Sequence, residues 1–204
     1  MFKKLFGKNF TAADFWIWFE KNSQDYYQLK EEKLNSLFYK LDKQLSKINE
    51  DIAFEFSADL IDGKREFIIS ADGILSAFTD VIDLVEKAPK LDGFKIIAFR
   101  PKSDVDDIST IEYEDISLGP DDVFFTYRKN GDTLDIVLYL KGYDSDFEEW
   151  ENAAFILLDT IIGEYDVATK IGSIDMLPYK ESPNLKPILE LPSLIDREVS
   201  GISF

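Results

Sequence analysis

The order of predicted elements repeats along this chain, and this repeat most constrains its fold. Residues 52–99 and 123–176 each read as a β-hairpin, a helix and a further strand. Matching positions lie about 70 residues apart, as two copies of one supersecondary unit would place them: Gly63 and Gly131, Ile74 and Asp146, Phe94 and Asp166. A chance recurrence of a common order of elements is the alternative. We expect the two halves to share one sheet.

Turn chemistry and two-residue alternation indicate the strands. Apolar residues alternate with polar or small ones from Ile52 to Phe56, which is typical of a half-buried strand. Asn130-Gly131 between apolar runs is the strongest hairpin signal in the chain. Gly172 marks a β-bulge in the strand expected over residues 165–176.

Two helices are expected ahead of the first hairpin. Thr11 and Asp14 form a capping box for the first, and leucines at three- and four-residue steps from Leu34 to Leu45 mark the second. Ser145 and Glu148 form a second capping box further along the chain. The predicted fold is α+β: a mainly antiparallel sheet with helices packed on one face, in a single domain over residues 1–181.

The segment 182–204 is predicted to be an extended arm. Pro183, Pro187 and Pro192 oppose regular structure there. Its apolar side chains need a surface on this domain or on another chain, so a homodimer formed through the arm is an open alternative.

The net charge and the missing residue types exclude several classes of function. Forty acidic and 23 basic side chains give a formal net charge of -17, which disfavours nucleic acid and favours a basic protein partner. The chain has no Cys, which removes thiolate chemistry, and no His, which removes the commonest general base. No metal or other cofactor is expected.

The N-terminal residues do not read as a secretion signal. Lys3 and Lys4 are followed by no continuous apolar stretch, and no run reaches the ~20 apolar residues of a membrane span. A weak membrane-surface anchor formed by Phe2, Leu5 and Phe6 is the alternative. We expect a cytoplasmic location.

Asp72 and Arg100 are the first candidate ligand-binding residues. They follow two strands, residues 65–71 and 94–99, which a parallel crossover through the intervening helix would make neighbours. Ligand sites in open sheets lie at such strand ends. The alternative is a structural role, in which Asp72 caps a helix and Arg100 balances nearby negative charge.

Glu164 and Asp166 are the second candidate pair. On the predicted strand they would share one face, where paired carboxylates split their pKa values for acid–base chemistry. Two further acidic segments could be taken for cation sites, but non-functional interpretations are favoured for both. The aspartates 104, 106 and 107 are expected to be solvated, and residues 144–148 lack the glycine of a calcium loop and fit a helix cap.

Several blocks of the sequence resemble a family of uncharacterised bacterial proteins. They are the aromatic run from Phe15 to Phe19, the segment Glu66–Gly73, the segment Ala98–Pro101 and the segment Gly163–Asp166. The resemblance spans residues 15–176 and implies no activity, cofactor or catalytic residue. The sequence favours a non-catalytic, immunity-like protein that binds another protein. A carboxylate-based or divalent-cation-dependent enzyme with a site near Asp72 and Arg100 is the alternative.

Overall fold

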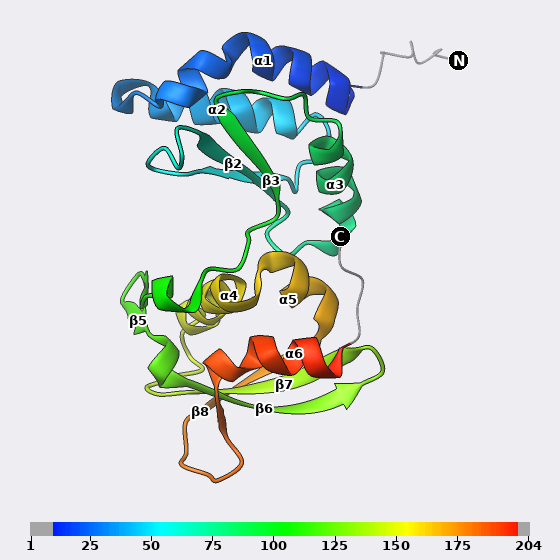
Figure 1. Cartoon of the computed structure of the whole chain (residues 1–204). Helices are drawn as coiled ribbons and strands as arrows, with labels where there is room; N and C mark the ends of the chain where they lie inside the picture. The colour runs from blue at the N-terminus through cyan, green and yellow to red at the C-terminus, as the bar shows by residue number, and fades with distance from the viewer. Residues whose placement is uncertain (1–9, 200–204) are drawn as a thin grey trace, which may run out of the picture. The chain divides into compact units, whose positions relative to one another are not determined.

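The computed structural model describes residues 10–199 and confirms the α+β class (Figure 1). The chain forms two compact units, Met1–Phe99 and Arg100–Phe204. The single domain expected from the sequence therefore consists of a pair of units, each with its own sheet. The proposed N-terminal surface anchor lies outside the described residues.

The N-terminal unit combines helices with a three-stranded sheet ordered β1-β2-β3. Its elements are α1 (Ala12–Gln28), η1 (Glu31–Lys33), α2 (Leu34–Leu45), β1 (Ala53–Phe56), β2 (Arg65–Ser70), η2 (Leu75–Ala77), α3 (Phe78–Glu86) and β3 (Phe94–Ala98). β1 and β2 pair antiparallel, and β3 pairs with β2 in parallel after the α3 crossover, as the sequence predicts.

Aromatic side chains form the core of this unit. The rings of Phe19 and Phe67 stack at 4.9 Å between their centroids, and those of Phe56 and Phe67 at 4.6 Å. The Trp16 indole donates a hydrogen bond of 2.7 Å to the Leu84 carbonyl, which joins α1 to α3. The capping box of Thr11 and Asp14 opens α1. Elements on several sides therefore bury α1, as its aromatic sequence requires.

The C-terminal unit contains a four-stranded sheet ordered β8-β7-β6-β9 and a small β4-β5 hairpin. Its elements are η3 (Val105–Asp107), β4 (Ile111–Tyr113), β5 (Ile116–Leu118), η4 (Pro120–Asp122), β6 (Val123–Asn130), β7 (Thr133–Leu140), α4 (Glu149–Ile162), α5 (Glu164–Lys170), β8 (Ile171–Pro178), β9 (Lys186–Pro187), η5 (Ile188–Glu190) and α6 (Leu191–Glu198). The sheet and helices α4 and α6 enclose one apolar core.

The predicted hairpin–helix–strand order is present in both units. In each, an antiparallel hairpin is followed by a helical segment and a strand that pairs in parallel with the second hairpin strand. The expectation of one shared sheet is wrong, because β3 completes the first sheet and β8 the second. Whether the units descend from a duplication stays a prediction.

Local predictions in the C-terminal unit have mixed outcomes. The bulge at Gly172 is confirmed by the shift in register between β7 and β8. The hairpin at residue 131 is confirmed, but its loop residues are Gly131 and Asp132, because Asn130 pairs with Thr133. The prediction of a capping box at Ser145 is wrong, since α4 begins after Glu148 without a side-chain cap.

The prediction of an extended C-terminal arm is also wrong for most of the described residues of the segment 182–204, which form β9, η5 and α6. Pro192 lies in the first turn of α6, where a missing N–H group breaks no helical hydrogen bond. Its apolar side chains are buried in the core of their own unit: Ile188, Leu191, Leu194 and Ile195. Burial of these four side chains therefore does not require a second chain. No helix among residues 10–199 combines the length and apolar character needed to cross a membrane.

Candidate functional site

Negative charge is concentrated in the C-terminal unit. Its 105 residues carry 23 acidic and 9 basic side chains, a formal charge of -14, whereas the 17 acidic and 14 basic side chains of the N-terminal unit give -3. Residues 103–127 and 142–169 contain no Lys or Arg. The chain's acidity is thus a property of one unit.

Three neighbouring segments of this unit form an acidic face. They are η3 with the residue before it, the β4-β5 hairpin, and residues 144–151, which lead into α4 and include its first turn. Eleven carboxylates belong to the face: Asp104, Asp106, Asp107, Glu112, Glu114, Asp115, Asp144, Asp146, Glu148, Glu149 and Glu151. All are exposed except Glu149, which is half-buried.

Hydrogen bonds and apolar packing hold the three segments together. The Asn152 amide on α4 donates a hydrogen bond of 3.5 Å to the Tyr113 hydroxyl on β4. The Ser103 backbone N–H, ahead of η3, donates to the Thr160 carbonyl of α4 at 2.8 Å. Side chains from the same connecting segments pack against the core beneath: Ile108, Ile111 and Ile116. The carboxylates are therefore presented on a fixed backbone.

Ion pairs among the described residues do not neutralise the charge of the acidic face. Among residues 10–199, none of the eleven carboxylates forms an ion pair with Lys or Arg. Burial, followed by the charges of Glu151 and Asp144, raises the pKa of the neighbouring Tyr143 phenol. Because like charges on a low-dielectric surface reinforce one another, the face attracts cations.

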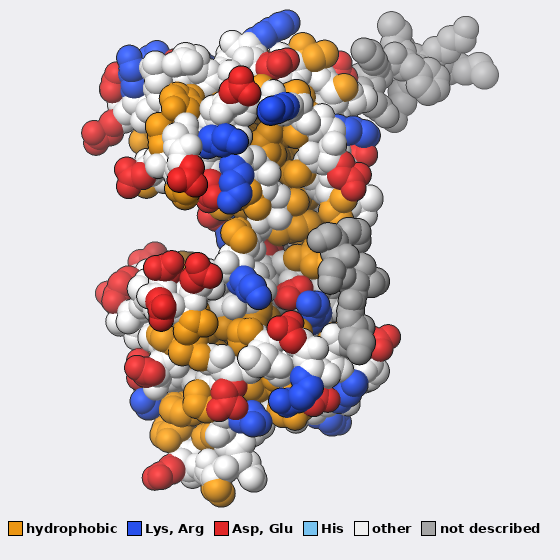
Figure 2. Space-filling view, in the orientation of Figure 1, with side chains coloured by type: hydrophobic (Ala, Val, Ile, Leu, Met, Phe, Trp, Pro, Cys, Tyr) orange, Lys and Arg blue, Asp and Glu red, His pale blue; other side chains and the backbone are white. Residues whose placement is uncertain are grey.

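Exposed apolar side chains lie among these charges. Phe147 is 54% exposed, Phe155 42% and Ile156 40%. Phe147, Glu151 and Phe155 follow at four-residue steps, which places Glu151 and Phe155 on the same side of α4. Figure 2 shows acidic and hydrophobic side chains next to one another over this part of the C-terminal unit. Exposed aromatic residues in a polar surround are typical of protein-binding surfaces.

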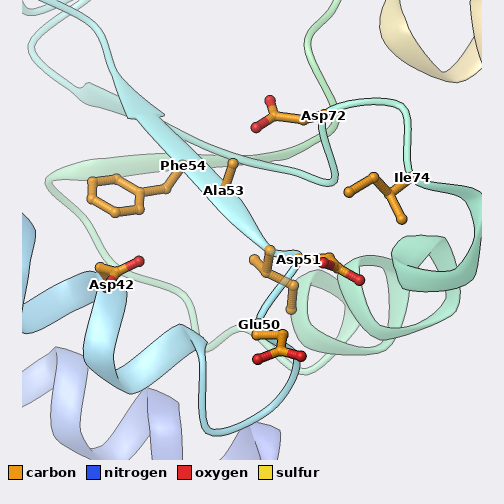
Figure 3. A pocket seen from close by; sticks show the side chains of 8 residues that line it. Asp42, Glu50, Asp51, Ala53, Phe54, Asp72 and Ile74 are labelled. Atoms are coloured by element: carbon orange, nitrogen blue, oxygen red, sulfur yellow. The ribbon is translucent and has the colours of Figure 1, made fainter.

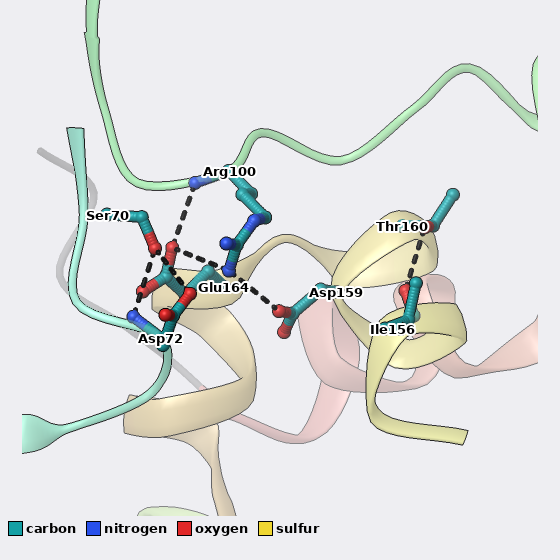
Figure 4. Close-up of polar contacts among 7 residues, drawn as sticks. All are labelled: Ser70, Asp72, Arg100, Ile156, Asp159, Thr160 and Glu164. Atoms are coloured by element: carbon teal, nitrogen blue, oxygen red, sulfur yellow. Dashed lines mark hydrogen bonds and ion pairs between the residues drawn. The ribbon is translucent and has the colours of Figure 1, made fainter. Parts of the chain in front are cut away.

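The structure brings the predicted residues Arg100 and Glu164 together. Glu164 is 1% exposed; its carboxylate accepts a hydrogen bond of 3.1 Å from the Arg100 backbone N–H, and its own N–H donates to the Arg100 carbonyl at 3.0 Å (Figure 4). The Arg100 guanidinium lies 3.9 Å from Glu164 and 3.8 Å from Asp159. These contacts anchor the first residues of the unit to the junction of α4 and α5.

Gly163 makes this anchor geometrically feasible. Its φ of +86° is one that side-chain-bearing residues rarely adopt, and a Cβ atom there would lie 3.2 Å from the Lys102 backbone nitrogen. The glycine ends α4 and lets α5 begin at once. The strand expected from residue 165 therefore begins only at Ile171.

Asp166 is not placed beside Glu164 as the strand prediction required. On α5 the two residues are two positions apart, and such residues do not face each other on a helix. The Asp166 carboxylate instead pairs with Lys170, one turn later, at 2.9 Å. The two carboxylates thus have separate partners.

Asp72 lies in the N-terminal unit, in the left-handed region at φ +47°, and its N–H donates to the Ser70 hydroxyl at 3.0 Å. It is one of four acidic residues around a shallow pocket of about 420 Å³ (Figure 3). The full lining is Asp42, Glu50, Asp51, Ile52, Ala53, Phe54, Asp72 and Ile74. Arg100 belongs to the other unit, so a ligand common to Asp72 and Arg100 stays a prediction.

Arg65 is a buried charged residue that the sequence analysis missed. It is 6% exposed, and its guanidinium donates to the backbone carbonyls of Tyr27, Ser57 and Ala58 at 2.5–3.2 Å. No group of three acidic side chains within residues 10–199 converges closely enough to hold a metal ion.

The sequence analysis also missed the acidic face, although the long stretches without Lys or Arg could have revealed it.

Comparison with known proteins found no matching protein-family model, no similar curated protein and no similar solved structure. The resemblance to uncharacterised bacterial proteins stays a prediction. The candidate site therefore rests on the chemistry of this chain alone.

Proposed function

We propose that this protein is a non-catalytic binding protein whose acidic face engages a basic protein partner, in the manner of immunity proteins. The observation that carries the proposal is the set of eleven carboxylates, interspersed with exposed Phe147, Phe155 and Ile156, that form no ion pair with any Lys or Arg the structure describes. A cytoplasmic location is part of the proposal.

Charge and apolar contact have separate roles in this binding. The uncompensated carboxylates accelerate the encounter with a positively charged protein and disfavour acidic competitors. The phenylalanines supply contact area that loses water on binding and slows dissociation. Affinity is therefore expected to fall with added salt without disappearing.

Charge-neutral variants test the proposal. The triple variant Glu148→Gln, Glu149→Gln and Glu151→Gln alters the face, whereas Glu20→Gln, Glu31→Gln and Glu32→Gln makes the same charge change on exposed residues of the N-terminal unit. Immobilised wild type and both variants are incubated with lysate, and retained proteins are identified by mass spectrometry and then purified for affinity measurement.

We expect a basic protein that the wild type and the N-terminal control bind alike and that the acidic-face variant binds at least tenfold more weakly. Phe155→Ala should weaken the same complex mainly through faster dissociation. Equal binding to all variants, or a partner that is not basic, would overturn the proposal.

Carboxylate-based or cation-dependent catalysis at the pocket beside Asp72 is the second candidate function; because no three described acidic side chains converge there, a bound cation would have at most two of them as ligands. The four acidic residues of the pocket surround an apolar wall that includes Phe54. A ligand that binds the folded chain raises its unfolding temperature by mass action. Thermal unfolding with millimolar Mg²⁺, Mn²⁺ or Ca²⁺ should then show a rise that Asp72→Asn removes. An equal rise in both proteins would exclude Asp72 from cation binding.

A further inference from the structure

Among the described residues of the C-terminal unit, no helix covers one face of its four-stranded sheet. α4, α5 and α6 lie together on the other side of β6 and β7 (Figure 1). The side chains of β7 alternate between half-buried and buried, and only the buried set belongs to the core. The alternate side chains of β6, β7 and β8 therefore form an open face.

Strand register aligns four apolar residues across this open face. Phe124 on β6 pairs with Tyr139 on β7 and with Pro187 on β9, and Tyr139 pairs with Leu177 on β8. We call these four residues the apolar row. Tyr179 extends it, because its ring centroid lies 4.9 Å from that of Phe124.

The exposure of the row is consistent with a contact surface. Leu177 is 46% exposed, and Phe124 and Tyr139 are half-buried although no helix covers them. The Lys141 ammonium lies 5.5 Å from the Phe124 ring centroid and 5.9 Å from that of Tyr179, so a cation borders the aromatic rings. A row of aromatic and aliphatic residues with a polar border has the composition of a small protein interface.

The open face differs from the rest of its unit in charge. Arg128 pairs with Asp135 at 2.7 Å, and Lys141 pairs with Asp122 at 3.4 Å. Asp175 is the one further acidic residue that β8 directs to this side. The charges around the row therefore nearly cancel, in a unit whose formal charge is -14. Two copies of the chain would repel each other through the acidic face, but they can approach through the open face.

We propose that two copies of this chain associate through their open faces, with the apolar rows in contact across a twofold axis. Sheets that pack face to face keep their strand directions within about 30° of each other or cross at about 90°. In a twofold arrangement the same surface of both chains forms the interface, so the apolar row of one chain packs against that of the other.

The size of the sheet limits the strength of this dimer. Three strands of eight residues and the two-residue β9 cover a projected area of roughly 400 Å² per copy. Stable interfaces bury about 800 Å² per partner, so the dimer should be weak and dependent on concentration. Because both copies carry a formal charge of -17, added NaCl should strengthen the association by screening their repulsion. Binding of a basic partner to the acidic face should instead weaken with salt.

Sedimentation equilibrium of the full chain tests the proposal, from about 1 µM to about 500 µM and at low and moderate NaCl. The wild type should rise from the mass of one chain, 23.5 kDa, toward twice that value, and more readily at the higher salt concentration. Leu177→Lys and Tyr139→Glu should each weaken association at least tenfold. Phe155→Lys is the matched control: its side chain has similar exposure to Leu177 but lies on the acidic face.

Circular dichroism and thermal unfolding establish that each variant is folded. If Tyr139→Glu unfolds the unit, the exposed position at Leu177 still decides the outcome. A mass of one chain at every concentration would overturn the proposal, and so would a dimer that Phe155→Lys weakens as much as Leu177→Lys. A dimer that salt dissociates would also contradict it, because its surface would then be charged.

Discussion

Single buried polar groups connect the elements of the N-terminal unit. Arg65 is the main example: its guanidinium donates to three backbone carbonyls, and the Tyr27 carbonyl belongs to the last turn of α1. That turn contains no basic residue of its own, so the Arg65 guanidinium from β2 provides the positive charge that interacts favourably with the negative end of the helix dipole. No local pattern could predict this contact, because 38 residues separate Arg65 from Tyr27.

Tyr26 provides a test of pH dependence at the residue scale. Its ring is fully buried, and its hydroxyl donates a hydrogen bond of 3.0 Å to the Leu37 carbonyl. Burial, reinforced by the neighbouring charge of Asp25, raises the pKa of Tyr26 from 10.0 to about 12. The unfolded chain therefore loses this proton first. The stability that Tyr26 contributes should be complete below pH 10 and lost as the pH rises toward 12.

Urea unfolding of wild type and Tyr26→Phe across this pH range measures the effect. The free energy of unfolding of wild type should fall relative to the variant by no more than about 3 kcal/mol. Tyr39→Phe is the control, because Tyr39 is 65% exposed. A constant difference between wild type and Tyr26→Phe from pH 10 to 12 would show that the phenol ionises normally.

At the scale of elements, α6 is an integral part of the C-terminal core. Leu194 is 2% exposed and packs among buried residues of the sheet and α4. Leu194→Ala should lower the free energy of unfolding by about 2–5 kcal/mol, as truncation of a buried leucine does. Chemical denaturation of the full chain measures this change, with Ile156→Ala as the exposed control. A change below about 1 kcal/mol would mean that α6 is only loosely attached.

The sequence predicted elements whose signals are local. The capping box of Thr11 fixes the start of α1, and the turn at Gly131 fixes the β6-β7 hairpin to within one residue. It failed at α5, where residues 164–170 alternate like a strand. The helix there depends on the positive φ of Gly163 and on hydrogen bonds to Arg100, 64 residues away from Glu164. It also failed at α6, because Pro192 was treated as a breaker at a position where helices accept proline.

The candidate sites were predicted less completely than the fold. Arg100 and Glu164 were both selected, but as members of different pairs, since the sequence does not show that α5 begins where Arg100 enters the unit. The acidic face combines η3 and the β4-β5 hairpin with residues 144–151, about 30 to 40 positions further along the chain, and the packing of the hairpin on α4 makes them neighbours. Composition revealed the charge of the chain, and the structure was needed to assign it to one unit.

At the scale of the whole molecule, the charge difference between the units predicts different responses to salt. A formal charge of -14 within 105 residues destabilises the folded C-terminal unit through repulsion, whereas -3 in the N-terminal unit does so weakly. The Debye length falls from about 30 Å at 0.01 M salt to about 10 Å at 0.1 M. The unfolding temperature of the C-terminal unit should therefore rise over this range, and that of the N-terminal unit should change less.

Tryptophan fluorescence can separate the two transitions. Trp16 and Trp18 belong to α1 and Trp150 to α4, so the Trp150→Phe variant reports on the N-terminal unit alone. The difference between wild type and this variant follows the C-terminal unit. If repulsion within the acidic face is a main cause, the triple Gln variant at Glu148, Glu149 and Glu151 should show a smaller rise with salt than wild type. Equal shifts for both units would mean that salt acts on the chain by a general effect and not through the charge of one unit.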